Sequence, residues 1–166
     1  EAWKGVDEIR AAGVPASDIV LDSPGGKLEA SEIQMNNAAL LDSAGVPVAF
    51  HTDDDITDSR WLLRSAALGV RAGMSREKAL EALTIAPARM MELDERLGSL
   101  TRGKDADFVI LSGDPLSVYT LVEQTWIEGV KVFDRSDPGQ RPYAVGGHDA
   151  MDDRTAHIHA GMEGHE

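Results

Sequence analysis

An apolar segment that ends in three consecutive aspartates is the strongest candidate for a reactive site in this 166-residue sequence. Residues 46–55 read VPVAFHTDDD, which predicts a buried strand ending in a run of negative charge. Side chains alternate across a strand, so the bulky Val48 and Phe50 should face one way and His51 and Asp53 the other. His51 and Asp53 would lie about 6.6 Å apart along such a strand. That spacing would let both side chains contact one substrate or one ion.

A carboxylate at the end of a strand can do two kinds of chemistry. It can bind a cation such as Zn²⁺, or it can accept a proton from a water bound to the metal. The alternative is a structural role, in which the acidic run stabilises the dipole of a helix that begins near Asp58 or Ser59. Both interpretations are open for Asp53, whereas the structural one is favoured for Asp54 and Asp55.

Two cations and one imidazole are further candidates for substrate binding. Lys27 ends the segment SPGGK between a predicted strand and a predicted helix, where it could hold an anion. The glycine spacing is not that of a phosphate-binding loop, and an ordinary turn is the simpler interpretation. Arg60 could bind a substrate carboxylate through two hydrogen bonds or form a surface ion pair. His51, taken alone, is more often a core histidine than a ligand.

Composition excludes several classes of function. The chain has 16 Lys and Arg against 29 Asp and Glu, a net charge of −13, which argues against a nucleic-acid partner. No stretch approaches the roughly 18 apolar residues of a membrane span. The absence of cysteine excludes disulfides and thiolate metal sites. The first residues do not have the pattern of a signal peptide, and the cellular location is not predicted.

Apolar periodicity predicts helices and strands in alternation through the first half of the chain. The expected helices and strands are a helix over 1–12, a strand over 18–22, a helix over 29–44, a strand over 46–52, helices over 61–72 and 75–83, and a short helix that Pro87 opens and that ends at Met91. This alternation is typical of parallel βα units and of the α/β class. A sheet of two parallel strands has two open edges, so we expect this half to need neighbouring strands.

The second half is richer in predicted strands. A strand is expected over 108–111, and segments 125–127 and 130–133 should form a hairpin around the tight turn Glu128–Gly129. We expect Asp105 and Asp107 to bond within the turn that precedes the first of these strands. The predicted domains are 1–95 for the βα portion, 96–137 for the β portion and 138–166 for a flexible tail.

Three segments together resemble a known family. VPVAFHTD at 46–53, ALTIAPARMM at 82–91 and RLGSLTRGKDADFVILSGDPL at 96–116 are similar to the C-terminal part of the amidohydrolase superfamily. The nearest branches are the imidazolonepropionase-like and prolidase-like hydrolases. The resemblance covers about residues 1 to 134, and its most specific part is the segment from Arg96 onward. His51 departs from the family, whose members usually have a small residue there.

The resemblance implies an α/β fold that contains the last two strands of a (β/α)₈ TIM barrel, with their helices, and strands of a small β-sandwich. It implies that Asp53 ligates zinc, as one of one or two divalent ions, and shuttles a proton for a metal-bound hydroxide. The implied reaction is hydrolysis of a C–N bond in an amide or cyclic amide of small size. His51 would then either contact the substrate or orient Asp53.

The resemblance also implies that most metal ligands lie elsewhere. A catalytic zinc needs about three protein ligands, and the family places the others on earlier strands. We therefore expect a C-terminal fragment that is inactive alone and whose partner is the N-terminal portion of the same enzyme, with homo-oligomerisation left open. His157 and His159 form an HxH pair, but their polar surroundings favour a flexible tail over the missing ligands. The alternative is a non-catalytic assembly fragment whose partner chain does the chemistry.

Overall fold

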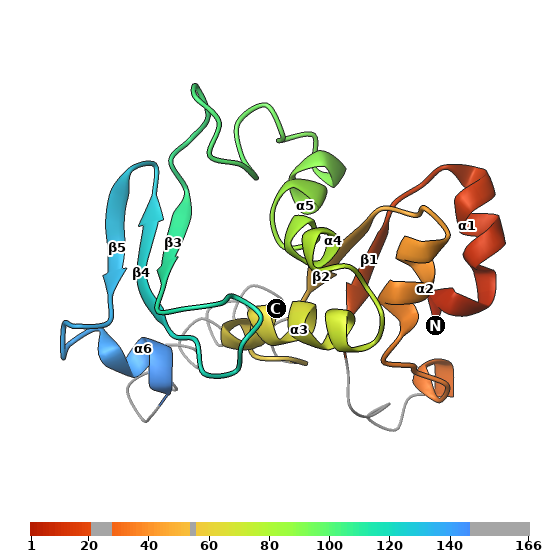
Figure 1. Ribbon diagram of the computed structural model, residues 1–166, viewed down its shortest axis with the longest axis horizontal. Coiled ribbons are helices and arrows are strands. Elements are labelled where there is room, and N and C mark those ends of the chain that lie inside the picture. Colours follow the sequence, from red (N-terminus) through yellow and green to blue (C-terminus); the bar gives the residue numbers. More distant parts are fainter. Residues whose placement is uncertain (21–27, 54–55, 147–166) are drawn as a thin grey trace, which may run out of the picture. The chain divides into compact units, whose positions relative to one another are not determined.

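The computed structural model describes residues 1–20, 28–53 and 56–146, which belong to two compact units (Figure 1). Unit 1 contains Glu1–Asp105 and Asp114–Thr120, and unit 2 contains Ala106–Gly113 and the chain from Leu121 onward. No helix in the described ranges is both long enough and apolar enough to span a membrane.

Unit 1 has the predicted alternation of helices and strands. Its elements are the 3₁₀ helix η1 (Ala2–Gly5), α1 (Val6–Ala12), β1 (Ala16–Ile19), the 3₁₀ helix η2 (Leu28–Ala30), α2 (Asn37–Ser43), β2 (Val48–His51), the 3₁₀ helix η3 (Ser59–Trp61), α3 (Leu62–Arg71), α4 (Arg76–Glu81) and α5 (Ile85–Met90). Strands β1 and β2 are parallel, with Ala16 opposite Val48 and Ile19 opposite His51. Because parallel strands need a crossover, α2 lies between them in the chain. This part of the α/β prediction is confirmed.

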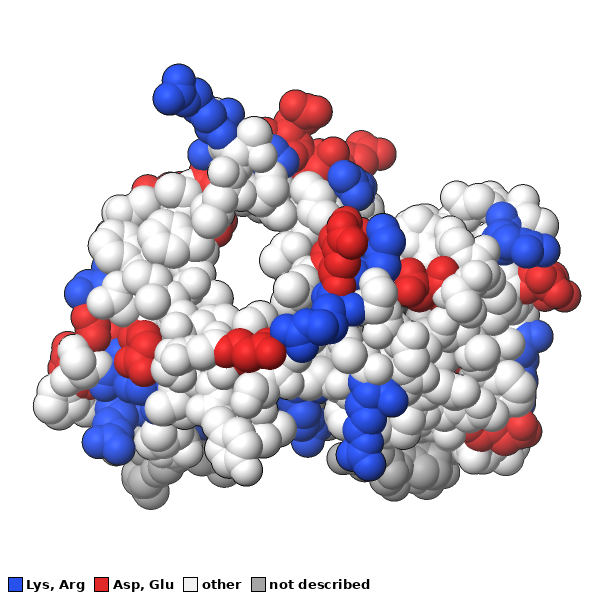
Figure 2. All heavy atoms as spheres, in the orientation of Figure 1, with Lys and Arg blue, Asp and Glu red and all other residues white. Residues whose placement is uncertain are grey.

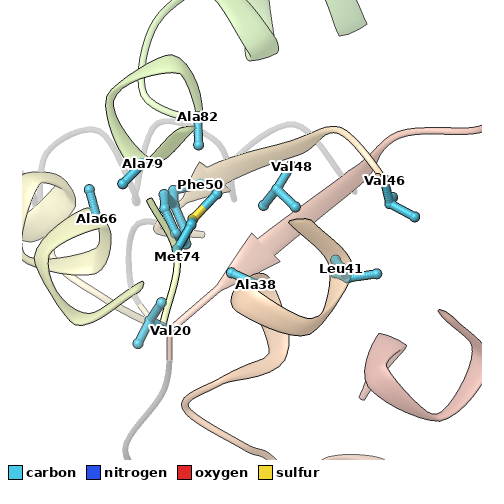
Figure 3. Close-up of a cluster of buried hydrophobic side chains, with 10 residues drawn as sticks. All are labelled: Val20, Ala38, Leu41, Val46, Val48, Phe50, Ala66, Met74, Ala79 and Ala82. Atoms are coloured by element: carbon cyan, nitrogen blue, oxygen red, sulfur yellow. The ribbon is translucent and has the colours of Figure 1, made fainter. Parts of the chain in front are cut away.

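The core of unit 1 forms where β2 meets its helices. Val48 and Phe50 are both buried there among small side chains of α2, α3 and α4 (Figure 3). Phe50 lies beside the sulfur of Met74, and its ring fits against Gly69 of α3. A Cβ atom at Gly69 would stand 2.8 Å from Phe50 Cζ, so only glycine leaves room for the ring. The bulky side of β2 therefore packs under helices, as alternation predicts.

The predicted helix over 29–44 is wrong in its first half. The chain forms η2 and then turns, and α2 begins only at Asn37. The backbone of Glu32 bonds to the N-terminal segment instead of to a helix: its N–H donates to Glu1 Oε1 at 2.6 Å, and its carbonyl accepts from Trp3 Nε1 at 3.1 Å. These two tertiary hydrogen bonds take the place of helical ones, because the backbone N–H and carbonyl of Glu32 are already paired and need no partner within a helix.

Several element boundaries also differ from the predictions by about two residues, and one helix was not expected. Strand β1 begins at Ala16, two residues earlier than expected, because Ala16 N–H donates to the Pro47 carbonyl at 2.9 Å. Helix α5 begins at Ile85, so Pro87 lies inside its first turn, where the missing N–H leaves no helical bond unmade. The predicted tail contains a short helix, α6 (Arg141–Val145).

The segment Asp114–Thr120 joins two strands of unit 2 but packs within unit 1. Arg76 of α4 donates two hydrogen bonds from Nη2 to the carboxylate of Asp114, at 2.8 and 2.9 Å. Leu116 packs against the core cluster of unit 1. The hydrogen bond from Arg76 lowers the pKa of Asp114 below its usual range.

Unit 2 is a three-stranded antiparallel sheet in the order β3 (Phe108–Leu111), β4 (Val122–Ile127) and β5 (Val130–Asp134). The predicted strand at 108–111 and the predicted hairpin are confirmed, although β4 begins earlier than expected. Glu128 and Gly129 have φ angles of 50° and 74°, which suit a type I′ turn. Phe108 stacks on Trp126 with ring centroids 5.5 Å apart. No described residue of this unit is buried, so its sheet has no core of its own.

The segment before β3 bonds differently from the prediction. Asp105 accepts a hydrogen bond from Arg96 Nη2 at 2.6 Å, and Arg96 lies nine residues earlier, outside the turn in which Asp105 was expected to bond. Asp107 instead accepts a hydrogen bond from Glu128 N–H at 2.7 Å. The side chain of Asp107 therefore links the start of β3 to the distant hairpin turn.

Candidate active site

Asp53 lies just beyond the carboxyl end of β2, with its side chain exposed. Two backbone hydrogen bonds fold the following loop back onto the strand end: Ile56 N–H donates to the Asp53 carbonyl at 3.1 Å, and Thr57 N–H donates to the Thr52 carbonyl at 3.0 Å. Asp53 has φ of 52°, in the left-handed region that non-glycine residues seldom occupy. Such backbone conformations cluster at functional sites, because the surrounding structure must hold them in place.

His51 is the last residue of β2 and is half-buried. In the parallel register it stands opposite Ile19 of β1. Because side chains alternate along a strand, it lies on the face opposite Phe50, which is the face away from the core cluster. Asp53 lies two residues beyond the strand with a left-handed backbone, so alternation along β2 does not determine the direction of its carboxylate, and a site shared by His51 and Asp53 stays a prediction.

Arg60 forms an ion pair within its own turn. Its Nε donates to Asp58 Oδ1 at 2.9 Å and its Nη2 donates to Asp58 Oδ2 at 2.5 Å. The Asp58 carboxylate also accepts from the backbone N–H of Arg60 at 2.9 Å, which caps η3. The hydrogen bond that Arg60 donates to Asp58 raises the pKa of Arg60. The ion pair considered for Arg60 is thus present, and its role in substrate binding stays a prediction.

Arg64 is a cation that no sequence motif indicated. It lies in the first turn of α3, and its guanidinium carbon is 5.7 Å from the centroid of the Trp61 ring. Its Nε is buried and has no hydrogen-bond partner. Among the described residues, every other buried side-chain nitrogen or oxygen has one. A charge-bearing group in that state is uncommon in folded proteins. The one-turn spacing of Trp61 and Arg64 is the only sequence signal that could have indicated the pair.

Several predicted site residues lie outside the described residues. These are Lys27, Asp54 and Asp55, together with His157 and His159 of the tail. Within 1–20, 28–53 and 56–146, no three His, Cys, Asp or Glu side chains form a group that could hold a metal ion. This part of the chain therefore offers Asp53 and His51 as single donors and not a complete metal site.

The charged surface of the described residues is mixed. On the face drawn in Figure 2, Lys and Arg side chains lie scattered among Asp and Glu side chains. Most of the ion pairs involve well-exposed side chains, such as Lys4 with Glu32 and Arg10 with Asp7. Exposed pairs of this kind contribute little to stability.

Comparison with known proteins identifies relatives that are all much longer than this chain. The amidohydrolase tasK of Hapsidospora irregularis is 31% identical over 130 residues, which are 78% of this chain and 13% of tasK. An amidohydrolase crystal structure from Thermotoga maritima MSB8 is 34% identical with a TM-score of 0.76, over 81% of this chain and 35% of that one. An adenosine deaminase from Xanthomonas campestris with bound zinc has 23% identity and a TM-score of 0.54, over 77% of this chain and 34% of that one, and shows a shared fold.

The family assignment rests on the greater part of the chain. The profile of the amidohydrolase family matches residues 3–133. This range contains both parallel strands of unit 1, the loop that carries Asp53 and nearly all of the three-stranded sheet. The match agrees with the resemblance seen in the three sequence segments. The chain belongs to the amidohydrolase family.

Proposed function

We propose that this chain is the C-terminal portion of a metal-dependent amidohydrolase that hydrolyses the C–N bond of an amide or cyclic amide, and that Asp53 is its catalytic and metal-binding carboxylate. The observation that supports this best is the position of Asp53. Its exposed carboxylate follows the carboxyl end of a parallel strand whose other face packs under helices. In βα-barrel enzymes the chemistry takes place at that end of the strands.

The proposal includes a larger fold than the two parallel strands described. β1, α2 and β2 form one βαβ unit, which would supply the last two strands of a (β/α)₈ barrel. The three strands of unit 2 would belong to a composite β-sandwich. The absence of buried residues in the described part of unit 2 supports this, because a sheet needs a covered hydrophobic face to be stable. The N-terminal portion of the same enzyme would supply the missing strands.

The donor atoms present suit a divalent ion but do not complete its site. Carboxylate oxygen and imidazole nitrogen are both accepted by zinc. Asp53 would be one ligand, and the remaining ligands would come from the N-terminal portion. When bound, such an ion acidifies a water molecule and polarises the carbonyl group of the substrate.

The chain's own residues would handle protons and substrate. Asp53 would take a proton from the attacking water and return it to the leaving nitrogen, which is the work of a general base and then a general acid. His51, the last residue of β2, would contact the substrate. Arg60 and Lys27 would lie on the loops at the carboxyl ends of the two strands, where the substrate enters. A small-molecule substrate is expected.

The test uses the complete enzyme with its N-terminal portion and with zinc restored. Asp53→Asn should lower kcat by about 10²- to 10⁴-fold, because both proton transfers lose their carboxylate. Metal content, measured in the same samples, should fall as well. Asp7→Asn on α1 is a matched control, because the Asp7 side chain is 85% exposed and forms an ion pair with Arg10.

Two outcomes would count against this function. Wild-type turnover in Asp53→Asn would eliminate the assigned role. A complex that purifies with its N-terminal partner but holds no stoichiometric metal would favour the alternative, in which this chain is a structural fragment of an assembly.

A further inference from the structure

A pocket of about 540 Å³ opens at the surface of unit 1, between the segment that leads into α2 and the end of α3. Three polar and three apolar residues line it: Gln34, Asn36 and Arg71, with Met35, Leu68 and Ala72. Its volume lies within the roughly 300–1,000 Å³ that is typical of small-molecule sites. None of these residues belongs to the loop that carries Asp53. The pocket is therefore not part of the candidate active site.

The three polar side chains of the pocket are not engaged elsewhere. In the described ranges, the amides of Gln34 and Asn36 and the guanidinium of Arg71 make no hydrogen bond or ion pair. All three groups present N–H donors, and Arg71 adds a permanent positive charge. Free donors around one hollow suit an oxygen anion, because a carboxylate can accept from several of them at once.

The apolar side of the pocket suits a hydrocarbon chain. Met35 is 41% exposed, and Leu68 and Ala72 are half-buried. Leu68 also packs against the core cluster of unit 1, so it forms a fixed wall. Methionine is unbranched and adapts its shape to a ligand. An alkyl chain that covers these side chains would remove apolar surface from water, which favours binding.

The fold holds both walls of the pocket in place without a ligand. Asn37 N–H donates to the Gln34 carbonyl at 3.1 Å, and the Asn37 side chain bonds to residues of β1 and η1. On the other wall, a Cβ at Gly73 would stand 3.9 Å from Ala39 Cβ, so the chain just after α3 closely approaches α2. A preformed pocket loses less conformational entropy when a ligand binds.

We propose that this pocket is a second binding site of the protein, for a small organic carboxylate with an apolar chain. Arg71 binds the carboxylate, with Gln34 and Asn36 as further donors, and Met35 and Leu68 contact the chain. Arg71 lies at the opposite end of α3 from the loop after β2, roughly 15 Å away along a ten-residue helix. The inference does not depend on the proposed function, because none of the pocket residues takes part in it.

Methionine methyl groups give a readout that is located at the pocket. The complete enzyme is labelled with ¹³C at these methyl groups and titrated with hexanoate, and NMR follows each signal. The signal of Met35, assigned by its loss in Met35→Leu, should shift and saturate. The signal of Met91, which is 68% exposed and follows α5, should not move.

Three further probes separate the charge from the apolar contact. Hexanol keeps the chain and loses the charge, acetate keeps the charge and loses most of the chain, and inorganic phosphate is an anion without a chain. Each should bind about 10-fold more weakly than hexanoate, measured at Met35. Equal affinity for hexanol would show a merely apolar hollow, and equal affinity for acetate or phosphate would show a general anion site. Either result would overturn the inference.

Arg71→Gln should weaken hexanoate binding about 10-fold, because it removes the charge and the guanidinium fork. It should leave hexanol binding unchanged, and the signal of the buried Met74 should keep its position, which shows that the fold is intact. Arg10→Gln is the matched control, because it removes the same charge from an exposed side chain of α1 outside the pocket.

Two further outcomes would overturn the inference. Unchanged hexanoate affinity in Arg71→Gln would reduce Arg71 to a cation that stabilises the C-terminal end of α3. A Met35 signal that none of the four probes moves would show that the pocket does not take small molecules of this class.

Discussion

Asn37 donates a hydrogen bond from Nδ2 to Oδ1 of Asp18 across 2.5 Å, which links the start of α2 to β1. The Oδ1 atom of Asn37 accepts from the backbone N–H of Trp3 at 2.7 Å, so one amide side chain holds three segments together. Asn37 is only 8% exposed. Burial raises the pKa of Asp18, and the hydrogen bond from Asn37 opposes that rise without cancelling it.

The raised pKa makes the stability contribution of Asp18 depend on pH. A carboxyl whose folded-state pKa exceeds its unfolded value, about 3.9 for aspartate, favours folding fully below that value and loses the contribution as pH rises through the folded-state pKa. Asp18→Asn removes the charge and keeps an acceptor for Asn37. The variant should therefore be more stable than wild type at pH 7, and the difference should shrink toward pH 4. Urea unfolding from pH 4 to 8 measures this, and a difference that does not vary with pH would contradict it.

Two glycines of the segment after α5 should respond very differently to alanine. Gly98 has φ of 81°, and a Cβ there would stand 2.8 Å from Ala88 Cβ and 2.9 Å from the backbone of Ile85 and Thr84. Gly103 has φ of 96° with nothing within 4 Å of the added atom. Gly103→Ala should lose about 1–3 kcal/mol from backbone strain alone. Gly98→Ala should lose clearly more in thermal unfolding, and equal losses would show that the clash is relieved.

Leu41 and Leu40 form a matched pair on α2. Leu41 is completely buried in the core cluster, whereas Leu40 is 37% exposed. Leu41→Ala should lower the free energy of unfolding by about 2–5 kcal/mol, because it removes buried methyl groups and leaves a cavity. Leu40→Ala should cost much less. Denaturant unfolding of both variants checks this, and similar losses would mean that the core is not centred on Leu41.

Local sequence signals predicted the elements whose bonds are local. Ser75 caps α4 by accepting from Lys78 N–H at 3.1 Å, the bond that a serine before a helix commonly makes. The hairpin around Gly129 follows from turn chemistry. The loss of helix at Glu32 could not be predicted, because its bonds go to Glu1 and Trp3, about thirty residues away. The same holds for Asp107 and its bond to the hairpin.

The sequence indicates where the candidate site lies, but it does not indicate which charged side chains pair with one another there. The apolar run predicts that the strand ends near His51, where β2 does end, but side-chain alternation does not extend to Asp53, which lies two residues later with φ of 52°. The sequence could not tell which arginine is engaged by an internal carboxylate. That distinction depends on the turn of η3, which brings Asp58 onto the Nε edge of Arg60 and leaves Arg64 without an acceptor.

The packing of Asp114–Thr120 within unit 1 bears on where the chain could accept a foreign peptide. This connection looks like an ordinary surface loop in the sequence, yet Asp114 and Leu116 anchor it among helices. An epitope tag inserted there would break those anchors. The turn at Glu128–Gly129 is exposed but is no freer, because its two backbone N–H groups donate to Asp107 and Ala106 and an insertion would break those bonds.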